Sequence, residues 1–172
     1  MQFTIRNYRP GDFMTLLAVD QSCFPVGIAY TQFELKTYVL RRGAFTLIAE
    51  VAGGTPPTDS SKPVDEAAQD YSILGFIVAE RTRASGHIIT IDVRAVARRH
   101  RIGSVLLQSA EEQFRLWNCQ GVRLETAVDN IAALSFYKRH GFNVVKTIPR
   151  YYSNGVDALL LEKDLLSPLS SS

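Results

Sequence analysis

The chain has 172 residues, enough for one domain with a full hydrophobic core. Hydrophobic residues make up 46% and charged residues 21%, a balance typical of folded globular proteins and unlike that of disordered chains. The formal charge of +2, from 19 basic and 17 acidic side chains, gives no chain-wide attraction to nucleic acids or to membrane surfaces. We therefore expect no nucleic-acid partner and no membrane partner, and no oligomeric state is predicted.

The apolar runs and the cysteines indicate the compartment. No apolar run approaches the ~20 residues that span a bilayer, and residues 1–6 alternate like a strand instead of forming a signal peptide. Cys23 and Cys119 lie far apart and lack metal-ligand spacing. We expect two reduced thiols, no metal site and a cytoplasmic protein.

The first 40 residues predict one strand and two helices. Residues 3–5 alternate in a short strand. Asp12 can cap a helix that must end at Phe24-Pro25. Thr31-x-x-Glu34 has the form of a capping box and predicts a second helix through about residue 40.

Three strands follow, with a long connection between the first two. Residues 44–51 and 73–83 are strand-like, and residues 52–72 between them are rich in Gly, Pro, Ser and acidic residues. This connection is predicted to be a mobile hairpin loop and not a domain boundary. A turn at Ser85-Gly86 is expected to lead into a strand over 87–93.

The remaining elements alternate between helix and strand. An apolar stripe at helical spacing predicts a helix from Ile102 to about Trp117. A strand over 122–127, a helix over 130–140 and a strand over 142–147 follow, and the Asn154-Gly155 turn leads into a last strand over about 158–162. Residues 1–166 are thus expected to form one mixed α/β domain, of order β-αα-βββ-α-β-α-ββ, around one twisted sheet, with a flexible tail over 167–172.

An arginine cluster precedes the helix that begins at Ile102. Arg94, Arg98, Arg99 and Arg101 place four cations within eight residues, with no acid among them. Free N–H groups at a helix N-terminus favour a bound anion, for which phosphate is the obvious candidate, while the alternative is a solvated basic turn. The chain has no G-x-x-x-x-G-K-[ST] and no G-x-G-x-x-G after its first strand, which excludes two common nucleotide-binding classes.

Two segments resemble the GNAT superfamily of acetyl-CoA-dependent N-acetyltransferases. Arg98-Arg99-His100-Arg101-Ile102-Gly103 is similar to the family's pyrophosphate loop, [Q/R]-x-x-G-x-[G/A], with Arg101 in place of the first glycine. We expect the loop amides to bind the diphosphate if residue 101 has ordinary helical dihedral angles. Asn130-x-x-Ala133-x-x-Phe136-Tyr137-x-x-x-Gly141-Phe142 resembles the second CoA-contacting segment. The resemblance implies a GNAT-type fold and acetyl-CoA as cosubstrate.

Within the superfamily, the chain is similar to the ribosomal-protein alanine N-acetyltransferases of the RimI type and to related protein N-terminal acetyltransferases. Residues 86–93 resemble their central strand, Leu124-Glu125 matches the spacing of their proposed catalytic glutamate, and residues 149–158 resemble their paired-tyrosine hairpin. The resemblance covers nearly the whole chain outside residues 52–72 and the tail. It implies acetyl transfer to the N-terminal α-amino group of a protein or peptide.

The resemblance also implies roles for individual residues. Glu125 is the expected general base, His87 is the reserve candidate because imidazole titrates near neutral pH, and Tyr137 is the expected general acid for the CoA thiolate. Alternative roles are an ion pair for Glu125 and ordinary satisfied polar groups for His87 and Tyr137. The expected cofactor-binding residues are Ile91, Asp92, Val93, Arg98, Arg99, His100, Arg101, Ile102, Gly103, Ser104, Asn130 and Tyr137. The expected acceptor-binding residues are Phe24, Pro25, Tyr30, Tyr151 and Tyr152.

Three other functions fit parts of the sequence. The same chemistry could serve a small-molecule amine, such as a polyamine or an aminoglycoside. A non-catalytic acyl-CoA-binding module would need neither Glu125 nor Tyr137. A nucleic-acid module would need a wider basic face than the arginine cluster supplies.

Overall fold

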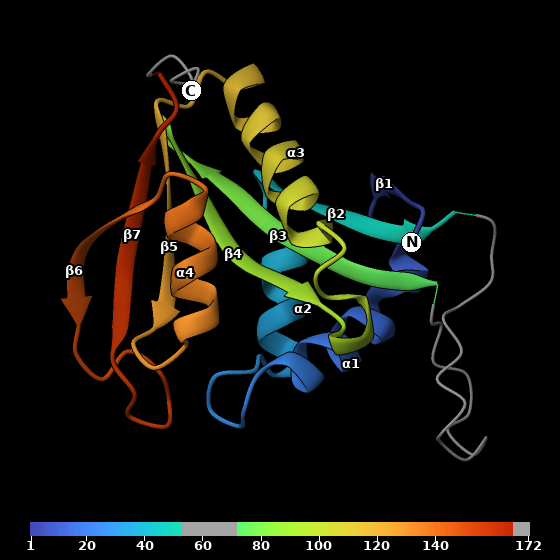
Figure 1. The fold of residues 1–172 in the computed structure, drawn as a ribbon, viewed down its shortest axis with the longest axis horizontal. Coiled ribbons are helices and arrows are strands. Elements are labelled where there is room, and N and C mark those ends of the chain that lie inside the picture. The colour runs from blue at the N-terminus through green and yellow to red at the C-terminus, as the bar shows by residue number, and fades with distance from the viewer. Residues whose placement is uncertain (53–71, 167–172) are drawn as a thin grey trace.

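The computed structural model describes residues 1–52 and 72–166, which form one seven-stranded sheet with helices on both faces (Figure 1). The spatial order of the strands is β1-β2-β3-β4-β5-β7-β6, and of the described strand pairs only β4 and β5 run parallel. The predicted mixed α/β, mostly antiparallel fold is confirmed. The strands are β1 (Phe3–Asn7), β2 (Ala44–Val51), β3 (Ile73–Thr82), β4 (Ser85–Val93), β5 (Gly121–Ala127), β6 (Asn143–Ile148) and β7 (Ala158–Asp164).

Helices cover both faces of the sheet (Figure 1). Helices α1 (Phe13–Cys23) and α2 (Gln32–Leu40) pack on one face, and α3 (Ile102–Leu116) and α4 (Ile131–Arg139) lie on the other. Because both faces are covered, the central strand β3 is buried over eight consecutive residues, 73–80. None of the described helices is long and apolar enough to cross a membrane.

Of the two side-chain caps predicted for α1 and α2, the structure contains only the cap of α2. Thr31 caps α2 as expected, because its side chain accepts from the Glu34 N–H and the Glu34 carboxylate accepts from the Thr31 N–H. Asp12 does not cap α1 with its side chain. Its carboxylate instead accepts from the Arg6 guanidinium at 2.8 Å and from the Arg9 N–H at 2.7 Å, which ties the start of α1 to β1.

The turn between β3 and β4 lies two residues earlier than predicted. Thr82 pairs with Ser85, so the turn residues are Arg83 and Ala84, with Arg83 in the left-handed region at a φ of 56°. Gly86, which had suggested a turn, is a strand residue whose Cβ would approach the Phe114 ring to 2.7 Å. Gly86 therefore serves close packing of α3, and the corrected register aligns Glu80 with His87.

The sheet opens between its two parallel strands. β4 pairs with β5 only over residues 85–88, against 121–124. Beyond this point β4 continues along β3 to Val93, while β5 continues along β7 to Ala127. The two strands therefore diverge and leave a wedge-shaped opening, into which one edge of β4 faces without a strand partner.

Two long connections, residues 52–72 and residues 149–157, agree in part with prediction. β2 and β3 pair antiparallel on either side of residues 52–72, as expected, but residues 53–71 and the tail 167–172 lie outside the described residues. Asn154 and Gly155 form a turn, in which Gly155 has a φ of 85° and the Asn154 side chain accepts from the Val156 N–H. This turn lies inside a longer connection, residues 149–157, and does not join β6 to β7 directly.

Candidate active site

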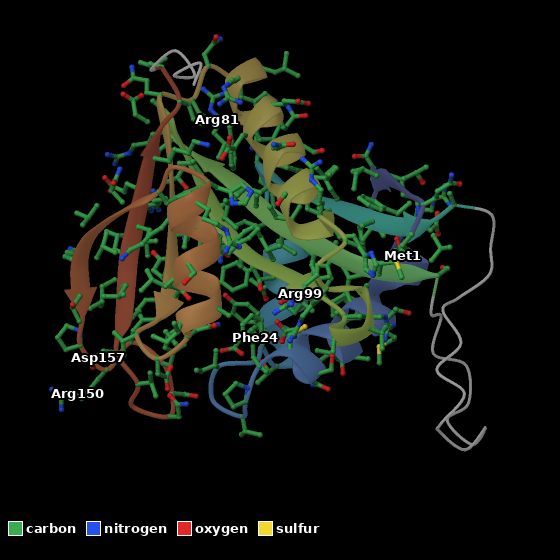
Figure 2. All side chains as sticks on the ribbon, viewed as in Figure 1. Met1, Phe24, Arg81, Arg99, Arg150 and Asp157 are labelled. Atoms are coloured by element: carbon green, nitrogen blue, oxygen red, sulfur yellow. The ribbon has the colours of Figure 1, made fainter. Side chains whose placement is uncertain are left out.

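The opening between β4 and β5 contains a cavity of about 850 Å³. Its walls come from β4, β5, the N-terminus of α3, α4, and the α1–α2 and β6–β7 connections. Figure 2 shows two lining residues, Phe24 and Arg99, in the same lower region of the view, with Arg81 at the opposite end of the molecule. The expected site residues that line this cavity are Phe24, Pro25, Tyr30, Ile91, Val93, Arg98, Arg99, Arg101, Ile102, Gly103, Ser104, Glu125, Asn130, Tyr137, Tyr151 and Tyr152.

Three expected site residues are not in the lining. His100 is exposed. The Asp92 side chain is buried on the α1 and α2 side of β4, where it accepts from the Thr90 hydroxyl at 3.1 Å, because alternate strand residues face opposite ways. His87 lies behind Glu125, as described below.

The end of the cavity at the start of α3, which we call the phosphate end, is strongly cationic. Arg98, Arg99 and Arg101 line it, joined by Arg139 from α4. Arg94, which the sequence grouped with this cluster, is instead a buried structural residue, since its Nε donates to the Ile73 carbonyl at 2.7 Å. The four lining arginines and the free N–H groups of α3 suit a diphosphate.

Arg101 does not have the helical dihedral angles that the sequence interpretation required. It precedes α3 at a φ of 64° and a ψ of 10°, and Arg99 also has a φ of 64°. A non-glycine residue pays ~1–2 kcal/mol for this left-handed conformation, whereas glycine adopts it freely. The glycine usual at this position of the motif therefore has a conformational reason. In this chain Arg101 adopts the left-handed conformation at an energetic cost and adds a cation to the cavity wall.

Helices α3 and α4 meet beside the phosphate end. A Cβ on Gly103 would lie 3.4 Å from the Phe136 ring, so the glycine keeps this contact close. His140 Nδ1 lies 2.7 Å from the Phe136 carbonyl, which only accepts, so Nδ1 carries a proton. In the neutral ring, Nε2 then accepts from the Ser104 hydroxyl at 3.0 Å and links the two helices.

Asn130 and Tyr137 of the α4 segment also line the cavity. The Asn130 side-chain oxygen caps α4 by accepting from the Ala133 N–H at 3.2 Å, which leaves its amide N–H groups for a ligand. Tyr137 is 9% exposed and packs edge-on against Phe136 and Phe142. Burial, and then the nearby Asp92, raise the pKa of the Tyr137 phenol well above its ordinary value. The hydroxyl therefore stays protonated at neutral pH and is available as a donor.

Glu125 and His87 form one hydrogen-bonded pair. Glu125 lines the cavity, and its Oε2 lies 2.7 Å from Nε2 of His87, which does not line it. The two candidates for the general base are thus linked, with Glu125 facing the cavity and His87 behind it. The side-chain partner of Glu125 is thus a histidine and not the arginine that the predicted alternative of an ion pair suggested.

Two residues that the sequence did not suggest extend this pair. His87 Nδ1 lies 3.4 Å from Oε1 of Glu80, and the Arg41 guanidinium lies 3.2 Å from Oε2 of Glu80. The sequence could have indicated Glu80 through the hairpin register, because a turn at residues 83–84 pairs Glu80 with His87. The turn predicted at Ser85-Gly86 gave a different register.

The part of the cavity bounded by the α1–α2 and β6–β7 connections, which we call the acceptor end, is aromatic. It is lined by Phe24, Pro25, Tyr30, Tyr151 and Tyr152, together with Ile28, Asp129 and Asn154, which the sequence did not suggest. Burial raises the pKa of Tyr151 to about 12, so its phenol is neutral at physiological pH. The Ser153 hydroxyl donates to the Gly27 carbonyl at 3.0 Å, so the two connections that bound this end touch each other.

Comparison with known proteins identifies the family. The sequence model of the acetyltransferase (GNAT) family matches residues 36–142, which is more than half of the chain. The chain belongs to the GNAT acetyltransferase family. An N-alpha-acetyltransferase of Sulfurisphaera tokodaii is 29% identical over 167 residues, which cover 95% of this chain and 94% of that protein.

Two solved structures extend the comparison of this GNAT acetyltransferase. Ard1 from Thermoplasma volcanium has a TM-score of 0.78 at 26% identity and covers 97% of this chain and 100% of its own. The ribosomal-protein-S18-alanine N-acetyltransferase from Escherichia coli has a TM-score of 0.75 at 16% identity, covering 99% of each chain, and supports the fold alone.

As a GNAT acetyltransferase, the protein uses acetyl-CoA, and the cavity residues fit this cosubstrate. The arginines and N–H groups of the phosphate end suit the diphosphate. The edge of β4 beyond Ile88, which has no strand partner on its β5 side, offers backbone groups to the amides of the pantetheine arm. Tyr137 also lines this cavity.

Asp20 of α1 holds the backbone of Tyr30, a residue of the acceptor end. It is fully buried, and its Oδ2 accepts from the Tyr30 N–H at 2.7 Å, while Oδ1 has no hydrogen-bond partner among the described residues. Burial raises the pKa of Asp20 to about 6, although the Tyr30 N–H opposes this change. The charged form of this acid is therefore disfavoured in the folded protein.

We expect Asp20→Asn to stabilise the protein at pH 8. Asparagine keeps an oxygen for the Tyr30 N–H and removes the buried charge. Because the folded-state pKa of about 6 exceeds the unfolded value, the contribution of Asp20 to stability is full below about pH 4 and is lost as pH rises toward 6. The variant should exceed wild type by about 1–2 kcal/mol at pH 8, with the difference vanishing near pH 4.

Urea unfolding between pH 4 and pH 8 measures this difference. Asp157→Asn is a matched control, because Asp157 also accepts a backbone N–H, from Arg150, but at the surface. This control should show no gain at pH 8. An Asp20→Asn variant less stable than wild type at every pH would contradict the prediction.

Proposed function

We propose that this acetyltransferase modifies the N-terminal α-amino group of a protein or peptide, with residues 1–166 as its single catalytic domain. The observation that carries the proposal is the placement of Glu125 and Tyr137 along one cavity whose acceptor end is aromatic. The relative from Sulfurisphaera tokodaii is named an N-alpha-acetyltransferase, and this chain matches it over nearly its whole length. This similarity supports the same acceptor class. Two free thiols, Cys23 and Cys119, support a cytoplasmic location.

The proposed reaction is a direct transfer. Glu125 takes a proton from the acceptor ammonium, and the neutral amine attacks the thioester carbonyl of acetyl-CoA. The carbon–sulfur bond then breaks, Tyr137 donates its proton to the departing thiolate, and the second proton that the acceptor nitrogen loses as the amide forms restores the phenol. A backbone N–H on the free edge of β4 polarises the thioester carbonyl.

The chemistry of the acceptor favours an α-amine over a lysine. An α-amino group has a pKa near ~7.7–8.0, and a lysine side chain has one near ~10.4. The difference of ~2.5 units corresponds to ~3.4 kcal/mol of extra work to form the neutral nucleophile. A single carboxylate base, Glu125, is better suited to deprotonating an α-amino group than to deprotonating a lysine side chain.

Steady-state assays with three kinds of acceptor test the proposal. We expect peptides with a free N-terminus to be acetylated with a kcat/KM at least ~100-fold above that for spermidine or an aminoglycoside, since only they extend along the acceptor end. The control is the same peptide with a blocked N-terminus and an internal lysine, which should stay unmodified by mass spectrometry. Preference for the free amines would overturn the proposal and support a small-molecule acetyltransferase.

The proposal has a narrower form, in which the acceptor is an alanine-first ribosomal protein. This form rests on the sequence resemblance to the RimI type. A library of peptides that differ in their first residue tests it, and we expect alanine-first peptides to be preferred.

A further inference from the structure

His140, which follows the last residue of α4, is hydrogen-bonded to the wall of the phosphate end. Its Nε2 lies 3.0 Å from the hydroxyl oxygen of Ser104, a cavity-lining residue in the first turn of α3. Its Nδ1 lies 2.7 Å from the Phe136 carbonyl, and the half-buried ring packs on the Phe136 ring with 4.3 Å between their centres. These contacts hold the imidazole against Ser104 in one orientation.

The two hydrogen-bond partners restrict the protons of the ring in different ways. A carbonyl oxygen only accepts, so Nδ1 carries a proton in both the neutral and the charged ring. A hydroxyl can donate and accept. In the neutral ring, Nε2 has a lone pair, and Ser104 must donate its one O–H to it. In the charged ring, Nε2 donates to the Ser104 oxygen, and the O–H of Ser104 is free to turn to another acceptor.

A diphosphate at the phosphate end competes for the O–H of Ser104. The oxygens of an ionised diphosphate only accept, so the hydroxyl can bond to one of them only by turning its proton away from Nε2. With a neutral ring, this leaves the lone pair of Nε2 without a partner at a half-buried position, which is unfavourable. A second proton on the ring removes the conflict, because Nε2 then donates to Ser104 while Ser104 donates to the phosphate.

We propose that His140 takes up a proton when the diphosphate of acetyl-CoA binds, and thereby directs the Ser104 hydroxyl from the ring to a phosphate oxygen. One proton passes from solvent to Nε2, and the proton of Ser104 stays on its own oxygen. When CoA leaves, the ring returns its proton to solvent. His140 is thus a positioning residue for the cosubstrate, and the inference does not depend on which amine is the acceptor.

The charges around the ring favour this linkage. The charged side chains on the described elements that contact or flank it are mostly cations: Lys138 and Arg139 of α4, Arg101 before α3, and Lys163 of β7, which pairs with Glu111 of α3 at 2.9 Å. These cations repel a second proton on the ring. A bound diphosphate has the opposite charge and compensates them, so its binding favours the charged ring.

Calorimetric titration with dephospho-CoA measures the protons taken up. This probe keeps the diphosphate and lacks the 3′-phosphate, whose own proton titrates near pH ~6. Titrations in two buffers of different ionisation enthalpy give the number of protons bound per ligand. A rise of one unit in the pH of the second protonation, centred on pH 7, corresponds to uptake of about 0.5 proton at pH 7. We expect this uptake in wild type, and an affinity that falls about 6-fold from pH 6 to pH 8.

Three variants assign the uptake to its source. His140→Gln should abolish both the uptake and the pH dependence of affinity, and Ser104→Ala, which removes the hydroxyl between ring and ligand, should reduce the uptake to below about 0.2 proton. His100→Gln is the matched control, because His100 is an exposed histidine of the loop before α3 that does not line the cavity. It should keep the wild-type uptake. No uptake in wild type, wild-type uptake in His140→Gln or Ser104→Ala, or its loss in His100→Gln overturns the proposal.

A spectroscopic measurement follows the ring directly. The chain has three histidines, so His140→Gln assigns the ring signals of His140 in ¹⁵N NMR spectra, and His87→Gln and His100→Gln assign them by exclusion if His140→Gln does not fold. We expect the neutral ring to carry its proton on Nδ1, and the pH of its second protonation to be about one unit higher with dephospho-CoA bound. A neutral ring protonated on Nε2, or the same titration with and without the ligand, overturns the proposal.

These measurements need no acceptor and are therefore separate from the test of the proposed function. A protein that acetylates free amines but no peptide overturns the proposed function and leaves the role of His140 unchanged. A protein that acetylates peptides but binds dephospho-CoA without proton uptake overturns only the role of His140.

Discussion

Replacement of Tyr137 by phenylalanine is expected to lower kcat by about 10- to 1,000-fold. The phenol lines the cavity, and its raised pKa keeps it protonated until a thiolate develops next to it. Phenylalanine keeps the ring contacts with Phe136 and Phe142 and removes only the donor. Affinity for acetyl-CoA should therefore stay within about 2-fold. Steady-state kinetics and calorimetric titration with CoA measure the two quantities.

Tyr8→Phe is the control for this loss. Tyr8 packs against the core beneath α1 and α2, outside the cavity, and burial also raises the pKa of its phenol. Removal of that hydroxyl should leave kcat near wild type. Normal turnover in Tyr137→Phe would remove Tyr137 from the mechanism.

Replacement of Glu125 by glutamine is expected to lower kcat/KM for a peptide acceptor by about 100-fold at pH 7. Glutamine retains the shape of the side chain beside His87 but cannot take a proton from the acceptor ammonium. Above pH ~8 an α-amine is mostly neutral without help, so the deficit should shrink as pH rises. A pH profile of kcat/KM for both proteins, from pH 6 to pH 9.5, measures this change.

Glu112→Gln provides the comparison, since Glu112 is an exposed residue of α3. It should follow the wild-type profile throughout. A deficit in Glu125→Gln that stays constant from pH 6 to pH 9.5 would assign Glu125 a structural or binding role in place of a base.

Much of the fold could be predicted because local rules apply to neighbouring residues. The Thr31 capping box, the Asn130 cap and the apolar stripe that begins at Ile102 each depend on residues within a few turns of one helix. The strands also followed from local alternation, and their order favoured one mixed sheet. The two cofactor-contacting segments are likewise short and contiguous, so a resemblance could be recognised in them.

The errors arose where a contact between distant residues overrides a local preference. Gly86 suggested a turn, but it lies within β4 because the Phe114 ring occupies the space of a side chain. Arg94 belongs by sequence to the cationic cluster, yet its side chain bonds to Ile73 in the core. Arg101 takes a left-handed conformation that a short apolar pattern does not reveal.

The sequence by itself thus determined the type and order of the elements, the family, and most residues of the cavity wall. Only the tertiary structure decided that β4 and β5 part after Ile88 and that Glu80, His87 and Glu125 meet. The physical reason is register. A shift of one residue in strand pairing reverses which side chains share a face, and that register depends on packing between residues far apart in the chain.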